Sequence, residues 1–140
     1  MNKTQRGGKS SELIVAGELL RQGLDVYTPY VDDQAIDLVL RAESQGEIRY
    51  YDLQVKSVKG YNRIIGLRDI SRKSSRYILI VHYRHEDRAD EFFYLTKEQI
   101  EQHMLPGSEW GDLVFNKPER EQYQAQTLAH LATCIQEGWR

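Results

Sequence analysis

The chain has 140 residues, of which 40% are apolar and 29% charged, and these proportions are typical of a globular protein with a buried core. We therefore expect one domain over residues 1–140. No segment has the ~18 continuous apolar residues of a membrane helix, which argues against a helical membrane protein. Cys134 is the only cysteine and the first residues lack an apolar signal-like run, so we expect a cytoplasmic protein without an intrachain disulfide.

The charge is distributed unevenly, although the net charge is only −2. Residues 1–76 hold 13 Lys or Arg and 10 Asp or Glu, whereas residues 77–140 hold 6 and 11. Positive charge is concentrated from position 56 to position 76, where Asp69 accompanies these cations: Lys56, Lys59, Arg63, Arg68, Arg72, Lys73 and Arg76. Such a cluster can bind phosphates, and it is equally typical of a solvated loop without a ligand.

Hydrophobic periodicity and turn residues predict the elements of the first half of the chain. These are a helix that Ser10 or Ser11 caps and that runs to Gln22, a short strand over 25–30, a strand over 36–41, a hairpin turn over 42–46 and a strand over 48–57. Side chains alternate between the faces of a strand, so Gln54 and Lys56 share one face.

The second half begins with a basic loop over 58–75 that holds at most a short strand. It continues with a buried strand over 77–83, a strand over 91–95, a helix over 96–104, a brief strand or irregular segment over 110–116 and a closing helix over 118–137. The four histidines are scattered over a strand, a turn and two helices, so we expect isolated core or surface residues.

Two glutamates of the first helix differ in position. At about 100° per residue, Glu12 falls within the apolar arc, whereas Glu18 falls on the opposite side with Arg21. The arc consists of Leu13, Ala16, Gly17, Leu19, Leu20 and Leu24. A carboxylate on a buried face needs a charged or donating partner, which makes Glu12 a candidate functional residue. The alternative is an ordinary first-turn glutamate that the helix dipole stabilises.

An acid, an amide and a lysine lie on the two strands joined by the hairpin. Asp37 belongs to the strand over 36–41, and Gln54 and Lys56 end the strand over 48–57. If Asp37 faces the side of Gln54 and Lys56, and the helix with Glu12 covers that side, the four groups meet at the strand ends. Carboxylate and amide oxygens are ligands that suit a divalent metal such as Mg²⁺.

This order of residues and elements resembles the PD-(D/E)XK nuclease superfamily, and within it the Holliday-junction resolvases and the homing endonucleases of group I introns. The matching stretches are 8–23, 26–29, 36–39 and 53–57. The resemblance matches Glu12 to the first-helix glutamate and Asp37 to the motif aspartate. It matches Gln54 to the second acidic position and Lys56 to the motif lysine. Ile36 stands where the motif has proline, and Gln54 gives the Gln-x-Lys form of the intron enzymes.

The resemblance implies an α/β fold with a restriction-endonuclease-like core, in which α-helices flank a central mixed β-sheet of about five strands. It implies a DNA endonuclease of the homing, restriction or junction-resolving type that depends on Mg²⁺, with Mn²⁺ as an alternative metal. Asp37, the Gln54 side-chain oxygen and the Val55 carbonyl would hold this metal. Glu12 would bind it through water or bind a second metal, and Lys56 would orient the attacking water or lower its pKa.

The resemblance also implies that a basic cluster holds the DNA backbone, through Lys59, Arg63, Arg68, Arg72, Lys73 and Arg76. A homodimer or higher homo-oligomer is expected, because cutting both strands of a duplex needs two sites. Two alternatives remain open. One is the same fold without cleavage, as a nucleic-acid-binding or assembly module, which the uncharged Gln54 favours. The other is an unrelated α/β domain in which Asp37 and Lys56 form a surface pair.

Overall fold

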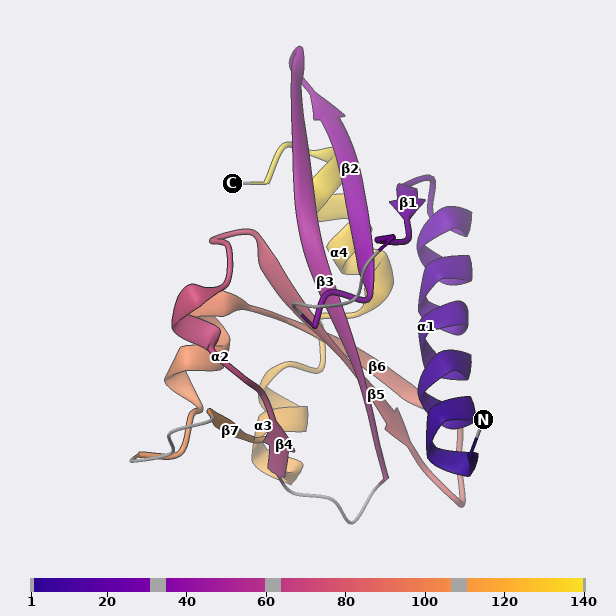
Figure 1. The fold of residues 1–140 in the computed structure, drawn as a ribbon, viewed down its shortest axis with the longest axis vertical. Coiled ribbons are helices and arrows are strands. Elements are labelled where there is room, and N and C mark those ends of the chain that lie inside the picture. The colour runs from indigo at the N-terminus through magenta and orange to yellow at the C-terminus, as the bar shows by residue number, and fades with distance from the viewer. Residues whose placement is uncertain (1, 31–34, 60–63, 107–110, 140) are drawn as a thin grey trace.

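The computed structural model describes residues 2–30, 35–59, 64–106 and 111–139. Its elements follow one another along the chain as shown in Figure 1: α1 (Lys3–Arg21), β1 (Asp25–Tyr27), β2 (Leu38–Ser44), β3 (Glu47–Lys59), β4 (Ile64–Gly66), the short 3₁₀ helix η1 (Ile70–Arg72), β5 (Tyr77–Arg84), β6 (Glu91–Thr96), α2 (Lys97–Gln102), β7 (Asp112–Val114), α3 (Lys117–Gln122) and α4 (Leu128–Gln136).

The central sheet has five strands in the order β1-β2-β3-β5-β6. Neighbouring strands are antiparallel except for β3 and β5, which are parallel, so the sheet is mixed as predicted. A parallel pair needs a crossover connection, and here the segment between β3 and β5 includes β4 and η1. The strand β4 pairs with β7 in a separate two-stranded sheet.

Each face of the central sheet carries its own apolar layer. One layer includes Leu53 and Val55 of β3 and is covered by α1 and α4. The other layer includes Leu79 and Val81 of β5 and is covered by the β4–β7 ribbon, η1 and the end of α3. In Figure 1, α1 runs along one side of the molecule, and α4 lies behind the β2–β3 hairpin. Because β3 contributes to both layers, its side chains are fixed on both faces.

The first helix begins eight or nine residues earlier than predicted. Asn2 forms a capping box with Gln5: the Gln5 amide donates to Asn2 Oδ1 at 2.8 Å, and the Asn2 amide donates to Gln5 Oε1 at 3.0 Å. Ser11, an expected cap, is instead buried inside the helix, and its hydroxyl lies 2.8 Å from His82 Nδ1. Residues 3–9 are polar or glycine and lack the hydrophobic periodicity that predicts a helix, so the start of the helix was predicted too late.

The buried face of α1 is also rotated from the predicted arc. Leu13 and Leu20 remain 64% and 55% exposed, and the centre of the buried face is Ser11, Val15 and Leu19. The expected arc followed the leucines, whereas the hydrogen bond from Ser11 to the sheet allows a polar residue at the centre of the contact. Glu18 is half-buried rather than fully outside, and it pairs with Arg21 at 2.8 Å.

The closing helix predicted over 118–137 is interrupted. The α3 helix ends at Gln122, Tyr123 then packs into the core, and α4 starts only at Leu128. Thr127 caps α4, because its hydroxyl accepts the His130 amide at 3.1 Å. The strand predicted over 25–30 is likewise shorter and ends at Tyr27.

Candidate functional site

Asp37 lies immediately before β2, at the point where β2 separates from β3. Its backbone amide donates to the Leu53 carbonyl at 2.8 Å, which extends the antiparallel ladder by one bond. Its side chain then continues the ladder, because Oδ2 accepts the Val55 amide at 2.7 Å. The carboxylate is therefore held in a fixed position against the backbone of β3, by a contact with a charged acceptor.

The Val55 carbonyl shares this edge of β3. The amide and carbonyl of one strand residue point to the same neighbouring strand, and the Val55 amide points to Asp37. Because β2 begins only at Leu38, paired with Leu53, no β2 residue stands opposite Val55 in the ladder. A carboxylate and a backbone carbonyl are thereby brought to one open edge.

Gln54 is buried, with 7% of its surface exposed, and its amide is directed to the face opposite α1. Its Oε1 accepts a hydrogen bond of 2.5 Å from the Tyr77 hydroxyl. Burial raises the pKa of Tyr77, and the nearby negative charge of Asp37 raises it further. Asp37 is bonded to Val55 and Tyr77 to Gln54, so the two contacts hold adjacent residues of β3. Tyr77 had no role in the sequence prediction.

Lys56 lies on the same face as Gln54, two residues further along β3, and is half-buried. Within the part of the chain that the structure describes, its ammonium group makes no hydrogen bond or ion pair. Asp52 lies on this face two residues before Gln54. Burial raises the pKa of Asp52, and the charge of Lys73 opposes that rise. The face therefore carries an acid, an amide and a lysine at successive outward positions of one strand.

Glu12 approaches from the other face, so the expectation that α1 covers Gln54 and Lys56 is wrong. The helix packs on the layer that contains Leu53 and Val55, because Val15 and Leu19 belong to that layer. Glu12 is 24% exposed at its side chain and pairs with Lys9 at 3.4 Å. It could reach the open edge of β3 only around the backbone.

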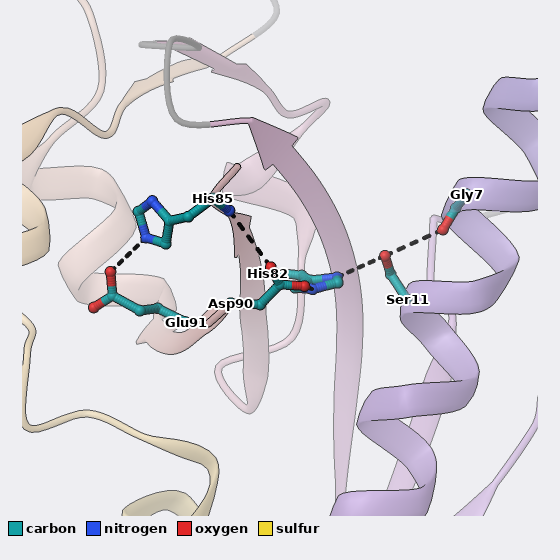
Figure 2. Close-up of polar contacts among 6 residues, drawn as sticks. All are labelled: Gly7, Ser11, His82, His85, Asp90 and Glu91. Carbon is teal, nitrogen blue, oxygen red and sulfur yellow. Dashed lines mark hydrogen bonds and ion pairs between the residues drawn. The ribbon is translucent and has the colours of Figure 1, made fainter. Parts of the chain in front are cut away.

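A polar network holds Ser11, the residue before Glu12, against the sheet (Figure 2). Its neighbour Ser11 contacts His82 Nδ1 at 2.8 Å, and His82 Nε2 lies 2.7 Å from Asp90 Oδ2. His82 is the register partner of Ser57 on β3. Ser11 is therefore level with Ser57, two residues past Val55. His82 is buried in the core, as expected, but its contacts with Ser11 and Asp90 were not predicted.

The predicted DNA-binding residues lie at the end of β3, where Lys59 is exposed, and in the segment between β3 and β5. Arg63 lies outside the described residues. Arg68, Arg72 and Arg76 are exposed. The ammonium group of Lys73 lies 5.9 Å from the centre of the Tyr77 ring. Lys97 supports this segment by donating to the backbone carbonyl of Lys73 at 2.9 Å.

Three oxygen groups near the start of β2 are of the kind that binds a hard divalent cation. They are a carboxylate from Asp37, a side-chain amide from Gln54 and a backbone carbonyl from Val55, and Mg²⁺ prefers such ligands. Their single negative charge predicts weak binding. Within residues 2–30, 35–59, 64–106 and 111–139, no three His, Cys, Asp or Glu side chains lie close enough to hold a metal together.

The mixed five-stranded sheet with flanking helices defines the class of fold. It is the restriction-endonuclease-like α/β fold that the sequence predicted. Within the described ranges, every helix is too short or too polar to cross a lipid bilayer.

Two solved structures share this fold over most of the chain. One is the bacterial homing endonuclease I-Ssp6803I, with a TM-score of 0.57, 16% identity, and coverage of 87% of this chain and 88% of that one. The other is Hjc, a Holliday junction resolvase from Archaeoglobus fulgidus, with a TM-score of 0.58, 15% identity, and coverage of 91% and 96%. No family model matches the sequence, and no curated protein matches it. At these identities the similarity establishes the fold.

Proposed function

We propose that this protein is a DNA endonuclease that uses a divalent metal ion, Mg²⁺ or Mn²⁺, to hydrolyse phosphodiester bonds. The observation that carries the proposal is the Asp37 carboxylate held by the Val55 amide at 2.7 Å where β2 leaves β3. That contact brings a carboxylate beside Val55, whose two neighbours along β3 are the amide Gln54 and the lysine Lys56. The two structures of the same fold are named as nucleases, which supports this type of activity.

Three oxygen groups would hold the metal: the Asp37 carboxylate, the Gln54 amide oxygen and the Val55 carbonyl. When bound, the metal supplies charge neutralisation at the phosphate and the leaving oxygen. The Gln54 oxygen keeps a second lone pair while Tyr77 donates to the first. Tyr77 therefore orients the amide oxygen without removing its capacity to bind a cation.

Lys56 and Glu12 would act from opposite sides of β3. Lys56, which is half-buried on the Gln54 face, would orient the attacking water and favour its deprotonation through its positive charge. Glu12 lies beyond the backbone of β3, so its role would be indirect, through a water molecule or a second cation. Exposed cations of the loop before β5 would hold phosphates, with Arg72 and Arg76 as the main candidates.

Plasmid nicking with matched lysine variants tests this proposal. We expect the protein to relax supercoiled DNA with Mg²⁺ or Mn²⁺ and not with EDTA. Lys56→Ala and Asp37→Asn should abolish nicking, whereas Lys117→Ala, an exposed lysine of α3 with 78% side-chain exposure, should not change it. Branched and linear duplexes should be compared, because the fold neighbours include a junction resolvase. Metal-dependent cleavage that survives Lys56→Ala would refute the assignment of the site.

One observation favours a second function, nucleic-acid binding without cleavage. Gln54 is neutral, buried and already bonded to Tyr77, so the site has fewer negative charges than an acidic motif would give. In that case, gel-shift assays would show DNA binding that is lost when Arg72 and Arg76 are replaced together by alanine, with no cleavage under any metal. Cleavage gained in Gln54→Glu would then identify residue 54 as the cause of inactivity.

A further inference from the structure

A pocket of about 420 Å³ lies between α4, the C-terminal end of the chain and the start of α2. Residues from the start of β5 and the end of β6 also line it. In Figure 1, α2 and the C-terminal end lie on the same side of β3. The volume is within the ~300–1,000 Å³ range of small-molecule sites. Asp37, Gln54 and Lys56 do not line this pocket, although Tyr77 does, so it is a neighbour of the proposed metal site and not part of it.

Trp139 is the central aromatic residue of the pocket. Its ring is parallel to that of Tyr51, with 6.1 Å between the ring centres, and edge-on to that of Tyr94 at 6.0 Å. Two hydrogen bonds hold its backbone, because its amide donates to the Cys134 carbonyl at 2.9 Å and its carbonyl accepts the Tyr51 hydroxyl at 2.8 Å. The residue is fixed in this way while it remains half-exposed. A fixed and accessible aromatic ring is a stacking surface for a planar ligand.

The charge of the lining is positive. Arg76 and Lys97 contribute two cations against one carboxylate from Glu98. The Lys97 ammonium group donates to the backbone carbonyls of Ser71 and Lys73 at 3.3 and 2.9 Å. Arg76 is exposed, and in the part of the chain that the structure describes its guanidinium makes no hydrogen bond or ion pair. Because a guanidinium binds phosphate through two parallel bonds, an anionic group is the expected occupant beside Arg76.

Amide side chains complete the lining. Gln99 and Gln126 bond to each other at 2.7 and 3.0 Å, and Gln126 also donates to the Tyr94 carbonyl at 2.6 Å. Gln102 is exposed, and among the described residues its amide has no hydrogen-bond partner. Since an amide both donates and accepts, Gln102 can pair with the mixed donor and acceptor edge of a nucleobase. The pocket therefore offers a stacking ring, an amide and a cation, which match the base and the phosphate of a nucleotide.

We propose that this pocket binds a nucleotide, with its base stacked on Trp139 and its phosphate at Arg76. Such a ligand has two sources, a free mononucleotide and an unpaired nucleotide of a DNA strand. The same side chains recognise both, because the base and the phosphate are common to them. The strand source rests on the proposed DNA function, whereas binding of a free nucleotide does not depend on it.

The fluorescence of Trp139 measures the stacking. In a Trp110→Phe background, Trp139 is the only tryptophan. Adenosine 5′-monophosphate should quench its emission to saturation without metal, whereas ribose 5-phosphate, which has no base, should not. Adenosine should need a concentration about tenfold higher, because it lacks the phosphate that bonds to Arg76, and Arg76→Gln should weaken the monophosphate by a similar factor. Arg21→Gln is the matched control, because Arg21 has 77% side-chain exposure and does not line the pocket.

The same readout distinguishes the two sources. A single-stranded adenylate oligonucleotide that quenches at a lower concentration than the monophosphate identifies a strand as the source. A monophosphate that binds equally well or better identifies the free nucleotide, and either result supports the proposal. Absence of quenching by both would overturn it. Equal binding of adenosine and its monophosphate, or an Arg76→Gln variant that binds as tightly as the Arg21→Gln control, would overturn it as well.

Alkylation of Cys134 gives a second measurement that needs no substitution. Cys134 lines the pocket, is half-buried and is the only cysteine of the chain. Saturating adenosine 5′-monophosphate should slow its reaction with iodoacetamide in the intact wild-type protein, and ribose 5-phosphate should not. An unchanged rate in the presence of the monophosphate would refute binding in this pocket. Because neither measurement contains metal or records cleavage, a failure here is distinct from failure of the nuclease proposal.

Discussion

Replacing Tyr77 by phenylalanine removes one buried donor while retaining the ring. Tyr77 and Gln54 have 1% and 7% of their surface exposed, so water cannot readily replace the lost hydroxyl. An unsatisfied buried acceptor costs about 1–3 kcal/mol. For a chain of 140 residues, a loss of about 1–2 kcal/mol should lower the melting temperature by about 3–8 °C.

A double-mutant cycle separates this hydrogen bond from general damage to the core. Gln54→Met removes the hydrogen-bond acceptor and retains an unbranched side chain. Because no acceptor is then left without a donor, Tyr77→Phe should reduce the free energy of unfolding by less in that background. The difference should be about 0.5–2 kcal/mol in urea unfolding. Tyr50→Phe is the control, because this exposed tyrosine should change stability by less than about 0.5 kcal/mol. Strictly additive effects of Gln54→Met and Tyr77→Phe would refute the inferred coupling.

The same phenol gives the protein a specific loss of stability at high pH. Burial, and then the charge of Asp37, raises the pKa of Tyr77 in the folded state above its ordinary value near 10. The unfolded chain then loses the proton first, so stability is complete below pH ~10 and decreases as pH rises further. Urea unfolding across this range should show the decrease in the wild type, and Tyr77→Phe should reduce it. An equal alkaline loss in both proteins would contradict the burial of this phenol.

Three further predictions concern the network beneath α1 and the metal ligands. Ser11→Ala should cost about 1–2 kcal/mol in thermal unfolding, because it leaves a ring nitrogen of buried His82 without a partner, whereas exposed Ser10→Ala should change stability little. The hydrogen bond from His82 lowers the pKa of Asp90 in the folded state. The Asp90 carboxylate therefore stabilises the fold at pH values above its unfolded pKa near 3.8, and this contribution is lost as the pH falls below that value. Asp90→Asn should make the free energy of unfolding depend less on pH in this acidic range. Gln54→Glu should tighten Mn²⁺ binding, measured by calorimetry, through its added charge, and unchanged affinity would place the metal elsewhere.

The sequence predicted the sheet better than it predicted the helices that cover it. Strand alternation placed Gln54 and Lys56 on one face correctly, because a period of two leaves little freedom once one face is buried. The face of α1 was mispredicted, because exposed Leu13 and Leu20 carry the hydrophobic signal while buried Ser11 depends on a histidine 71 residues away. Two residues that contact each other across so many positions leave no periodic pattern in the local sequence. The Tyr77–Gln54 bond was missed for the same reason.

The break in the predicted closing helix also had a weak signal. Tyr123 looked compatible with a continuous helix, but its side chain is needed in the layer below β5 and β6. Gln126 then binds the β6 backbone, with its amide nitrogen 2.6 Å from the Tyr94 carbonyl. Tertiary contacts of two residues therefore outweigh the helical preference of the segment.

The contact that holds Asp37 and the contact that anchors α1 differ in the length of chain that each encloses. The bond from Val55 to Asp37 closes a loop of 18 residues, whereas the contact from Ser11 to His82 spans 71. Loop closure over the longer span costs about 1.2 kcal/mol more in chain entropy. The carboxylate, amide and carbonyl are thus assembled by a hairpin and its neighbour, whereas Glu12 is placed by a distant anchor. Sub-global opening should therefore release α1 before it disturbs Asp37, and amide hydrogen exchange should be faster in the helix than in β3.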